Sequence, residues 1–111
     1  MSKKILGQLN PSATTVETLY TVASLKEAVI STISVANTTA TGATFRLILQ
    51  PLADVSGTIL TKQYLAYDIT VGASDSTVIT IGLTMAAGDV IKVYGSTADL
   101  AFQAFGDEAT A

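Results

Sequence analysis

The sequence contains no cysteine, no histidine and no tryptophan, and only 14% of its 111 residues are charged. Without histidine, the chain lacks the side chain that most often acts as general base and metal ligand near neutral pH. Without cysteine, neither a disulfide nor a thiolate metal site can form, which suits assembly in a reducing cytoplasm. These absences remove the usual residues of nucleophilic and metal-assisted catalysis.

The scarcity of charge also limits the possible partners. The net charge is −3, with only six lysines and arginines. Nucleic-acid binding depends on clusters of basic residues, so we expect no nucleic-acid partner. An ordinary domain carries about 25% charged residues. The low value here predicts that other subunits cover part of the surface.

Long apolar runs are missing as well. A membrane-spanning helix needs about 18 consecutive apolar residues, and no such run occurs, so we expect no membrane span. The opening MSKKILGQLNPS has two lysines but no apolar run of about 7–15 residues. We therefore do not expect it to be a signal peptide.

The sequence is rich in alternating apolar and small polar residues. Residues 62–96 illustrate the pattern, reading KQYLAYDITV, STVITIGLTM and VIKVYGS, with the turn-forming segments GASD and AAGD between them. Alternation with period two predicts strands with one buried and one exposed face. Gly and Asp between them are typical of tight turns.

The whole chain is predicted to be all-β. Seven or eight alternating segments at these spacings indicate a single-domain β-sandwich or jelly-roll-like fold of about seven or eight antiparallel strands. Pro11 favours a turn that ends an extended N-terminal arm. We therefore expect an arm over 1–14, the β-sandwich over 15–106 and a frayed C-terminal tail over 107–111.

The alternation also predicts which side chains face the core. In residues 61–71 it gives an inward set (Leu65, Tyr67, Ile69 and Val71) and an outward set (Tyr64, Ala66, Asp68 and Thr70). In residues 26–37 both sets contain apolar side chains. We expect that strand to be nearly buried on both sides.

Carboxylates are the remaining candidates for chemistry. Asp68, Asp75, Asp89 and Asp99 could in principle form an acid–base pair. Asp75 and Asp89 lie in turns, where aspartate commonly bonds to the local backbone, and Asp68 suits an exposed strand position. Calcium loops space their aspartates regularly, and no such spacing occurs. We expect no enzyme, no catalytic residue, no metal and no cofactor.

Five residues are candidates for an interface. Tyr64 and Tyr94 have outward parity, so they could stack on sugars or anchor an interface, unless the fold covers both faces of their strands. Ile5, Leu6 and Leu9 are the apolar residues of the arm. They either reach a neighbouring subunit or form an edge strand of their own sandwich.

Two long segments carry a family resemblance. GQLNPSATTVETLYTV followed by KEAVISTISVANTTATGATFRLIL resembles small virion structural proteins of tailed bacteriophages, including those of cyanophages and similar environmental phages. KQYLAYDITV and LTMAAGDVIKVYGSTADLAFQAFG resemble the same proteins, so the likeness covers nearly the whole chain. The family often has Pro-x-Gly where this chain has Ala23-Ser24-Leu25, which affects one turn.

The resemblance implies a head decoration or cement protein. Such a protein would form a homotrimer, bind the major capsid protein and lie on the capsid surface of a virion assembled in the host cytoplasm. The alternative is a tail or baseplate surface protein, including a carbohydrate-binding β-sandwich for host attachment. The family supplies no catalytic residue.

Overall fold

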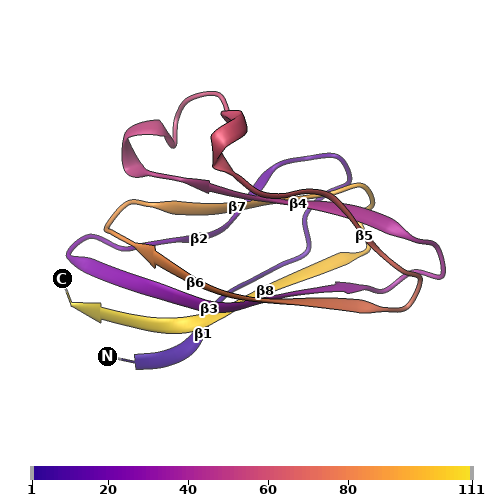
Figure 1. The fold of residues 1–111 in the computed structure, drawn as a ribbon, viewed down its shortest axis with the longest axis horizontal. Coiled ribbons are helices and arrows are strands. Elements are labelled where there is room, and N and C mark those ends of the chain that lie inside the picture. Colours follow the sequence, from indigo (N-terminus) through magenta and orange to yellow (C-terminus); the bar gives the residue numbers. More distant parts are fainter. Residues whose placement is uncertain (1, 111) are drawn as a thin grey trace.

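The computed structural model describes residues 2–110, which form two four-stranded antiparallel sheets packed face to face (Figure 1). The strands are β1 (Ser2–Leu9), β2 (Glu17–Thr21), β3 (Lys26–Asn37), β4 (Ala43–Gln50), β5 (Tyr64–Val71), β6 (Ser76–Met85), β7 (Val90–Gly95) and β8 (Leu100–Thr110). Two short 3-10 helices, η1 (Leu52–Asp54) and η2 (Thr61–Gln63), lie between β4 and β5. The prediction of an all-β sandwich is confirmed.

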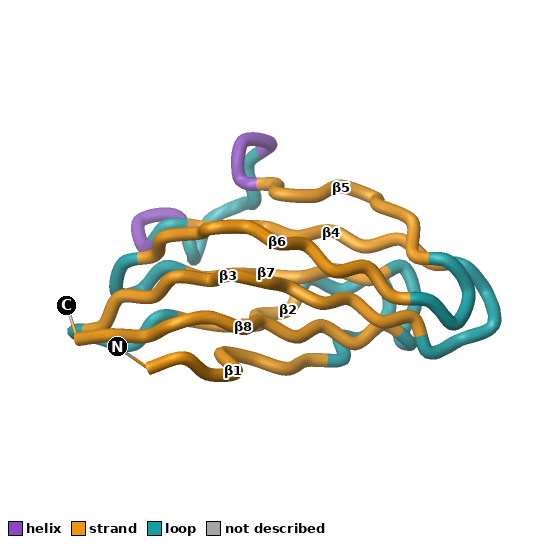
Figure 2. Tube along the Cα trace, turned by 60° about the horizontal axis from the view of Figure 1, so that its bottom comes forward, coloured by secondary structure: helices purple, strands orange, loops and turns teal. Residues whose placement is uncertain are grey.

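The strand order is that of a jelly roll. One sheet has the order β1-β8-β3-β6 and the other β2-β7-β4-β5. The pairs β1–β8, β2–β7, β3–β6 and β4–β5 are those expected when one long hairpin folds over on itself, which is how a jelly roll is built. The strands run along the length of the molecule, and the loops gather at its two ends (Figure 2).

The core lies between the two sheets. At its centre Phe45 of β4 meets Phe102 of β8 edge to face, with ring centroids 6.1 Å apart. Both rings are fully buried, together with Ile33, Leu47 and Ile91 from neighbouring strands. Burial of this many large apolar side chains supplies the main force that holds the sheets together.

The β1-β8-β3-β6 sheet bends along a line of bulges. Leu6 of β1 is an extra residue opposite the step from Ala104 to Phe105 of β8, and Ser31 of β3 is an extra residue opposite the step from Phe105 to Gly106. An extra residue reverses the alternation of side chains beyond it. In β3 the buried positions therefore shift from even numbers before Ser31 to odd numbers after it. The prediction that both faces of this strand are nearly buried is wrong, because the apolar set simply changes parity.

The two ends of the chain belong to the sandwich. Residues 2–9 form edge strand β1 beside β8, which is the second of the two alternatives for this segment. The predicted frayed tail is wrong for residues 107–110, because β8 continues through them and pairs with both β1 and β3. Residues 1 and 111 lie outside the described part of the chain.

A polar link joins the sheets at this end. The Tyr20 hydroxyl on β2 donates to Glu108 Oε2 on β8 at 2.7 Å, and Lys4 Nζ on β1 donates to Glu108 Oε1 at 2.9 Å. Lys4 and Tyr20 lower the pKa of the Glu108 carboxyl by stabilising its charged form. Burial and the neighbouring carboxylate raise the pKa of Tyr20.

The Glu108 link predicts a pH-dependent part of the stability. Because the pKa of Glu108 is lower in the folded state, its contribution is complete above the unfolded value of about 4.3 and is lost as pH falls through the folded value. The free energy of unfolding, measured in urea, should therefore fall more between about pH 5 and pH 3 for the wild type than for Glu108→Gln. Glu27→Gln, at an exposed position of β3, controls for the loss of one charge. Equal pH dependence in wild type and Glu108→Gln would contradict this role.

Candidate functional site

Arginine and tyrosine side chains gather on the outer face of the β2-β7-β4-β5 sheet. Arg46 comes from β4, Tyr94 from β7, and Tyr64, Tyr67 and Asp68 from β5. We call these five residues the arginine–tyrosine cluster. Arg46 lies directly opposite Tyr94 in the ladder, which places both side chains on the same face.

A bulge in β5 brings the other members to Arg46. Phe45 pairs with Ile69 and Leu47 pairs with Ala66, so the single residue Arg46 lies opposite both Tyr67 and Asp68. Asp68 has a φ of 51°, a left-handed conformation that allows the extra residue. The predicted inward orientation of Tyr67 is therefore wrong: the ring lies on the outer face and is 54% exposed.

Arg46 is held from three sides. Its guanidinium carbon lies 4.2 Å from the ring centroid of Tyr67 and 4.3 Å from that of Tyr94. Its Nε and Nη2 donate to the two carboxylate oxygens of Asp68 at 2.7 and 3.3 Å. The Asp68 carboxylate raises the pKa of Arg46 further above its ordinary value. Stacking on two rings and a two-point ion pair fix the arginine in a single geometry.

Tyr64 extends the cluster toward a small hollow. Its ring meets that of Tyr67 edge to face, with centroids 4.9 Å apart at 88°. Ile59 and Thr61 complete the lining of the hollow. The site thus offers aromatic surface next to hydroxyl groups, and tyrosine and arginine are the residue types enriched where proteins bind partners.

The loop 51–63 builds one wall of this hollow and covers the rest of the face. Gln63 Oε1 accepts hydrogen bonds from Gln50 Nε2 at 3.0 Å and from the Leu60 backbone at 2.9 Å. Lys92 Nζ of β7 donates to the Val55 carbonyl at 3.1 Å. Ile48 is fully buried beneath this loop although it has the outward parity of β4. The cluster end of this face is not covered by the loop and is open for a partner.

The opposite sheet presents an outer face of a different kind. Residues that pair across the ladder share a face, so the side chains beside Phe105 can be followed from strand to strand. We call the following set the neutral face: Ile5, Gln8, Val29, Thr32, Ser34, Ala36, Ser76, Val78, Thr80, Gly82, Thr84, Ala101, Gln103 and Phe105. It contains no charged residue. Charged side chains do lie at the end of this face near the chain termini: Lys3 and Asp107 share a row of the ladder with Val29 and Thr84, and Glu27 lies one row beyond.

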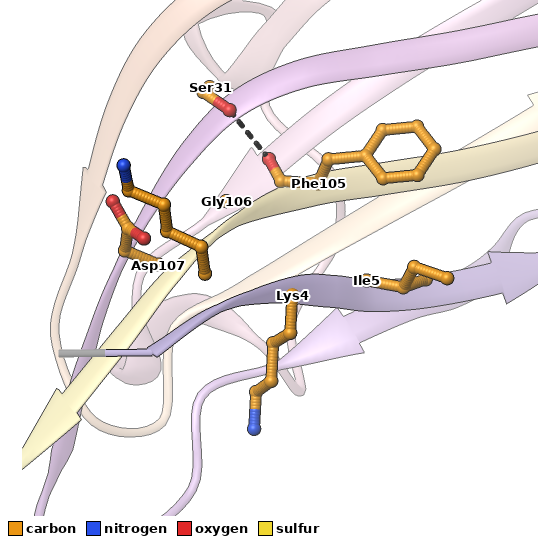
Figure 3. Close-up of a pocket in the computed structure, with 7 residues that line it drawn as sticks. Lys4, Ile5, Ser31, Phe105, Gly106 and Asp107 are labelled. Atoms are coloured by element: carbon orange, nitrogen blue, oxygen red, sulfur yellow. Dashed lines mark hydrogen bonds between the residues drawn. The ribbon is translucent and has the colours of Figure 1, made fainter.

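Figure 3 shows the hollow where the sheet bends, at the end of the neutral face, with Asp107 among its lining residues. Ile5 on β1 lies opposite Phe105 on β8, and Ile5 is 54% exposed. The Ser31 hydroxyl donates to the Phe105 carbonyl at 3.1 Å and so supports the bulge. The Lys4 side chain points away from Phe105 and Asp107. Two large apolar side chains therefore lie next to each other, with Lys3 and Asp107 in the next row on the same face.

The five predicted interface residues do not form one surface. Tyr64 and Tyr94 belong to the cluster, whereas Ile5 belongs to the neutral face of the other sheet. Leu6 and Leu9 are partly buried and pack against the core, so they are less accessible than residues of an extended arm would be. Sequence reasoning did not include Arg46 or Tyr67 in the site, because their contact depends on the β5 bulge.

Three of the four candidate carboxylates, those of Asp68, Asp75 and Asp89, bond to other groups of the fold. Asp75 Oδ1 accepts from the Ser76 backbone at 2.7 Å, and Asp89 accepts from the Ala86 and Leu52 backbones. Their predicted role in turns is confirmed. Within residues 2–110, no group of three or more acidic, histidine or cysteine side chains could hold a metal. The helices in this part of the chain are also too short to cross a bilayer.

Comparison of the chain with protein-family models and with curated proteins gives no match. Neither surface therefore receives a ligand or a partner from a known relative. Function has to be inferred from the surfaces themselves and from the sequence resemblance.

Proposed function

We propose that the chain is a non-enzymatic structural subunit of a tailed-phage virion, a decoration or cement protein that binds the head shell and contacts copies of itself. Its main partner would be the major capsid protein. The virion role is inferred from the sequence resemblance. The neutral face is the surface proposed to contact the head shell. Jelly rolls serve as viral capsid domains and also as lectins, so the fold is compatible with this role and with carbohydrate binding.

The neutral face is the observation that carries the proposal. Fourteen uncharged residues from four strands share this face, and charged residues (Lys3, Glu27 and Asp107) lie on it only near the chain termini. A lone soluble domain usually keeps mixed charges on every face. A surface of small polar and apolar side chains can be buried against a shell without the desolvation cost of unpaired charges.

Binding of this kind would stabilise the shell by linkage. A protein that binds only the assembled shell lowers its free energy by RT ln(1 + [L]/Kd) at each site. Heads that carry the protein should therefore rupture at a higher temperature than heads stripped of it. Equal rupture temperatures would contradict the cement role.

Ile5→Glu tests the contact surface itself. The side chain is exposed, so the variant should fold, but it places a charge beside Phe105 at the β1 edge of the neutral face. We expect its affinity for stripped heads to fall about tenfold or more, which corresponds to about 1.4 kcal/mol. Leu25→Glu is the matched control, because Leu25 is an exposed apolar residue in the turn between β2 and β3. Equal binding by the two variants would argue against the neutral face as the contact.

The second candidate function is a tail or baseplate surface protein that binds carbohydrate. The exposed ring of Tyr67 beside Tyr64 and Thr61 favours it, since sugar rings stack on aromatic faces and bond to hydroxyl groups. A glycan array with the wild type and Tyr67→Ala tests it. Binding that the variant loses would support a lectin role, and an array without signal for the wild type would exclude it for the glycans displayed.

A further inference from the structure

The four edge strands of the sandwich are protected to different degrees. In β1, Lys3 and Lys4 and the bulge at Leu6 discourage pairing with another strand. Strand β2 is only five residues long and includes Glu17, and β5 has bulges and the charged Asp68. In contrast, β6 has ten residues, STVITIGLTM, with neither charge nor proline. Natural proteins usually blunt such edges, so an unprotected one is suited to pairing with a further strand.

The first half of β6 is regular enough to pair. Residues 76–80 stand opposite residues 36–32 of β3 without a break, and the register shifts only beyond Thr80. Alternate backbone N–H and C=O groups of this segment point away from β3. At its centre Val78 lies on the neutral face and is 62% exposed, which makes it one of the most exposed large apolar side chains of the molecule.

We propose that β6 pairs antiparallel with β6 of a second copy of this chain, about a twofold axis through Val78. This inference rests on the proposed function, in which the protein contacts copies of itself, and it identifies β6 as the surface of that contact. In this register Val78 faces Val78 of the second copy, Thr77 faces Ile79 and Ser76 faces Thr80. Asp75 then falls opposite Ile81, so no like charges meet along the new ladder.

A second copy suits this edge because of what lies behind it. The inward side chains Ile79, Ile81 and Leu83 of β6 are only partly buried, and Ile69 on neighbouring β5 is 44% exposed although it pairs with buried Phe45. The core is thus open between β5 and β6. A continuing strand covers part of these side chains and gains apolar burial as well as backbone hydrogen bonds. It also joins two neutral faces into one surface.

The mass of the purified protein in solution tests the pairing. Light scattering after size exclusion should give twice the 11.4 kDa of one chain for the wild type. Val78→Lys and Val78→Glu each place like charges face to face at the axis, and we expect each to weaken the dimer on the order of 100-fold. An equal mixture of the two variants should dimerise again, because lysine then faces glutamate. Ile5→Lys, the same kind of change on the opposite edge of the sheet, should remain a dimer.

Other outcomes would overturn the proposal. A monomeric wild type, a trimer such as the resemblance implies, or a Val78→Lys protein that stays dimeric would each exclude pairing at this edge. Far-ultraviolet circular dichroism of each variant checks that it is folded. Shell binding is measured separately on heads, so the failure of edge pairing and the failure of the virion role give different results.

Discussion

Replacing Gly106 with alanine is expected to lower the free energy of unfolding by about 3 kcal/mol or more. A Cβ at this position would overlap the backbone carbonyl oxygen of Val29 and lie 3.0 Å from the Ile30 Cα. Both are backbone atoms of the paired strand β3, so no side-chain rotation can relieve the overlap. For a domain of this size the loss corresponds to a fall in melting temperature of roughly 12 °C or more, measured by calorimetry.

Gly82→Ala is the control for Gly106→Ala. It makes the same change in the same sheet, but its Cβ would meet no atom within 4 Å. We expect its stability to stay within about 0.5 kcal/mol of the wild type. Similar losses for the two variants would contradict the close approach of β8 to β3 at the bend.

Replacing Phe102 with alanine is expected to cost about 3–5 kcal/mol. The ring is fully buried at the centre of the core and packs edge to face on Phe45. Its removal leaves a cavity that neighbours on both sheets can fill only in part, and it also removes an aromatic pair worth about 0.5–1.5 kcal/mol. Urea unfolding of the variant measures the loss.

Phe105→Ala is the matched control for the core variant. Phe105 lies three positions further along β8, but its ring lies on the neutral face and is partly exposed. We expect a loss of no more than about 1.5 kcal/mol, because little of its contact is with the core. If Phe102→Ala cost as little as Phe105→Ala, the assignment of inner and outer faces of β8 would be wrong.

Alternation predicts the regular strands of this protein well. In β6 the less exposed positions are Thr77, Ile79, Ile81 and Leu83, which alternate as the sequence does, and in β7 the alternating apolar residues Ile91 and Val93 are buried. Exposure alternates with period two along the whole of β6 and from Ile91 onward in β7. The pattern therefore carries enough information to assign their faces.

The failures lie where a strand contains an extra residue. Ser31 in β3 and the Tyr67–Asp68 pair in β5 each interrupt the alternation. Beyond such a residue the inner and outer positions exchange, so a prediction that assumes uninterrupted alternation assigns side chains to the wrong face. Gly106, a glycine inside an alternating segment, was a usable sign of irregularity near Ser31. Asp68 is a weaker sign: aspartate is enriched among the non-glycine residues that adopt the left-handed conformation it has here, but such residues are only a few per cent of all.

The candidate surfaces could be predicted only in part. Outward parity was enough to select Tyr64 and Tyr94, and apolarity was enough to select Ile5. The contact of Arg46 with Tyr67 depends on the register between β4 and β5, which the sequence does not contain. The neutral face requires four strands to be placed in order, and strand order in a jelly roll is set by long-range pairing rather than by local pattern.

Under the proposed virion role, cryo-electron microscopy of phage particles that contain this protein tests the central claim most directly. The proposed decoration role predicts copies of an eight-stranded jelly roll on the outside of the head, with the neutral face against the major capsid protein. Density for the protein at the tail or baseplate, or its absence from the purified particle, would contradict that claim.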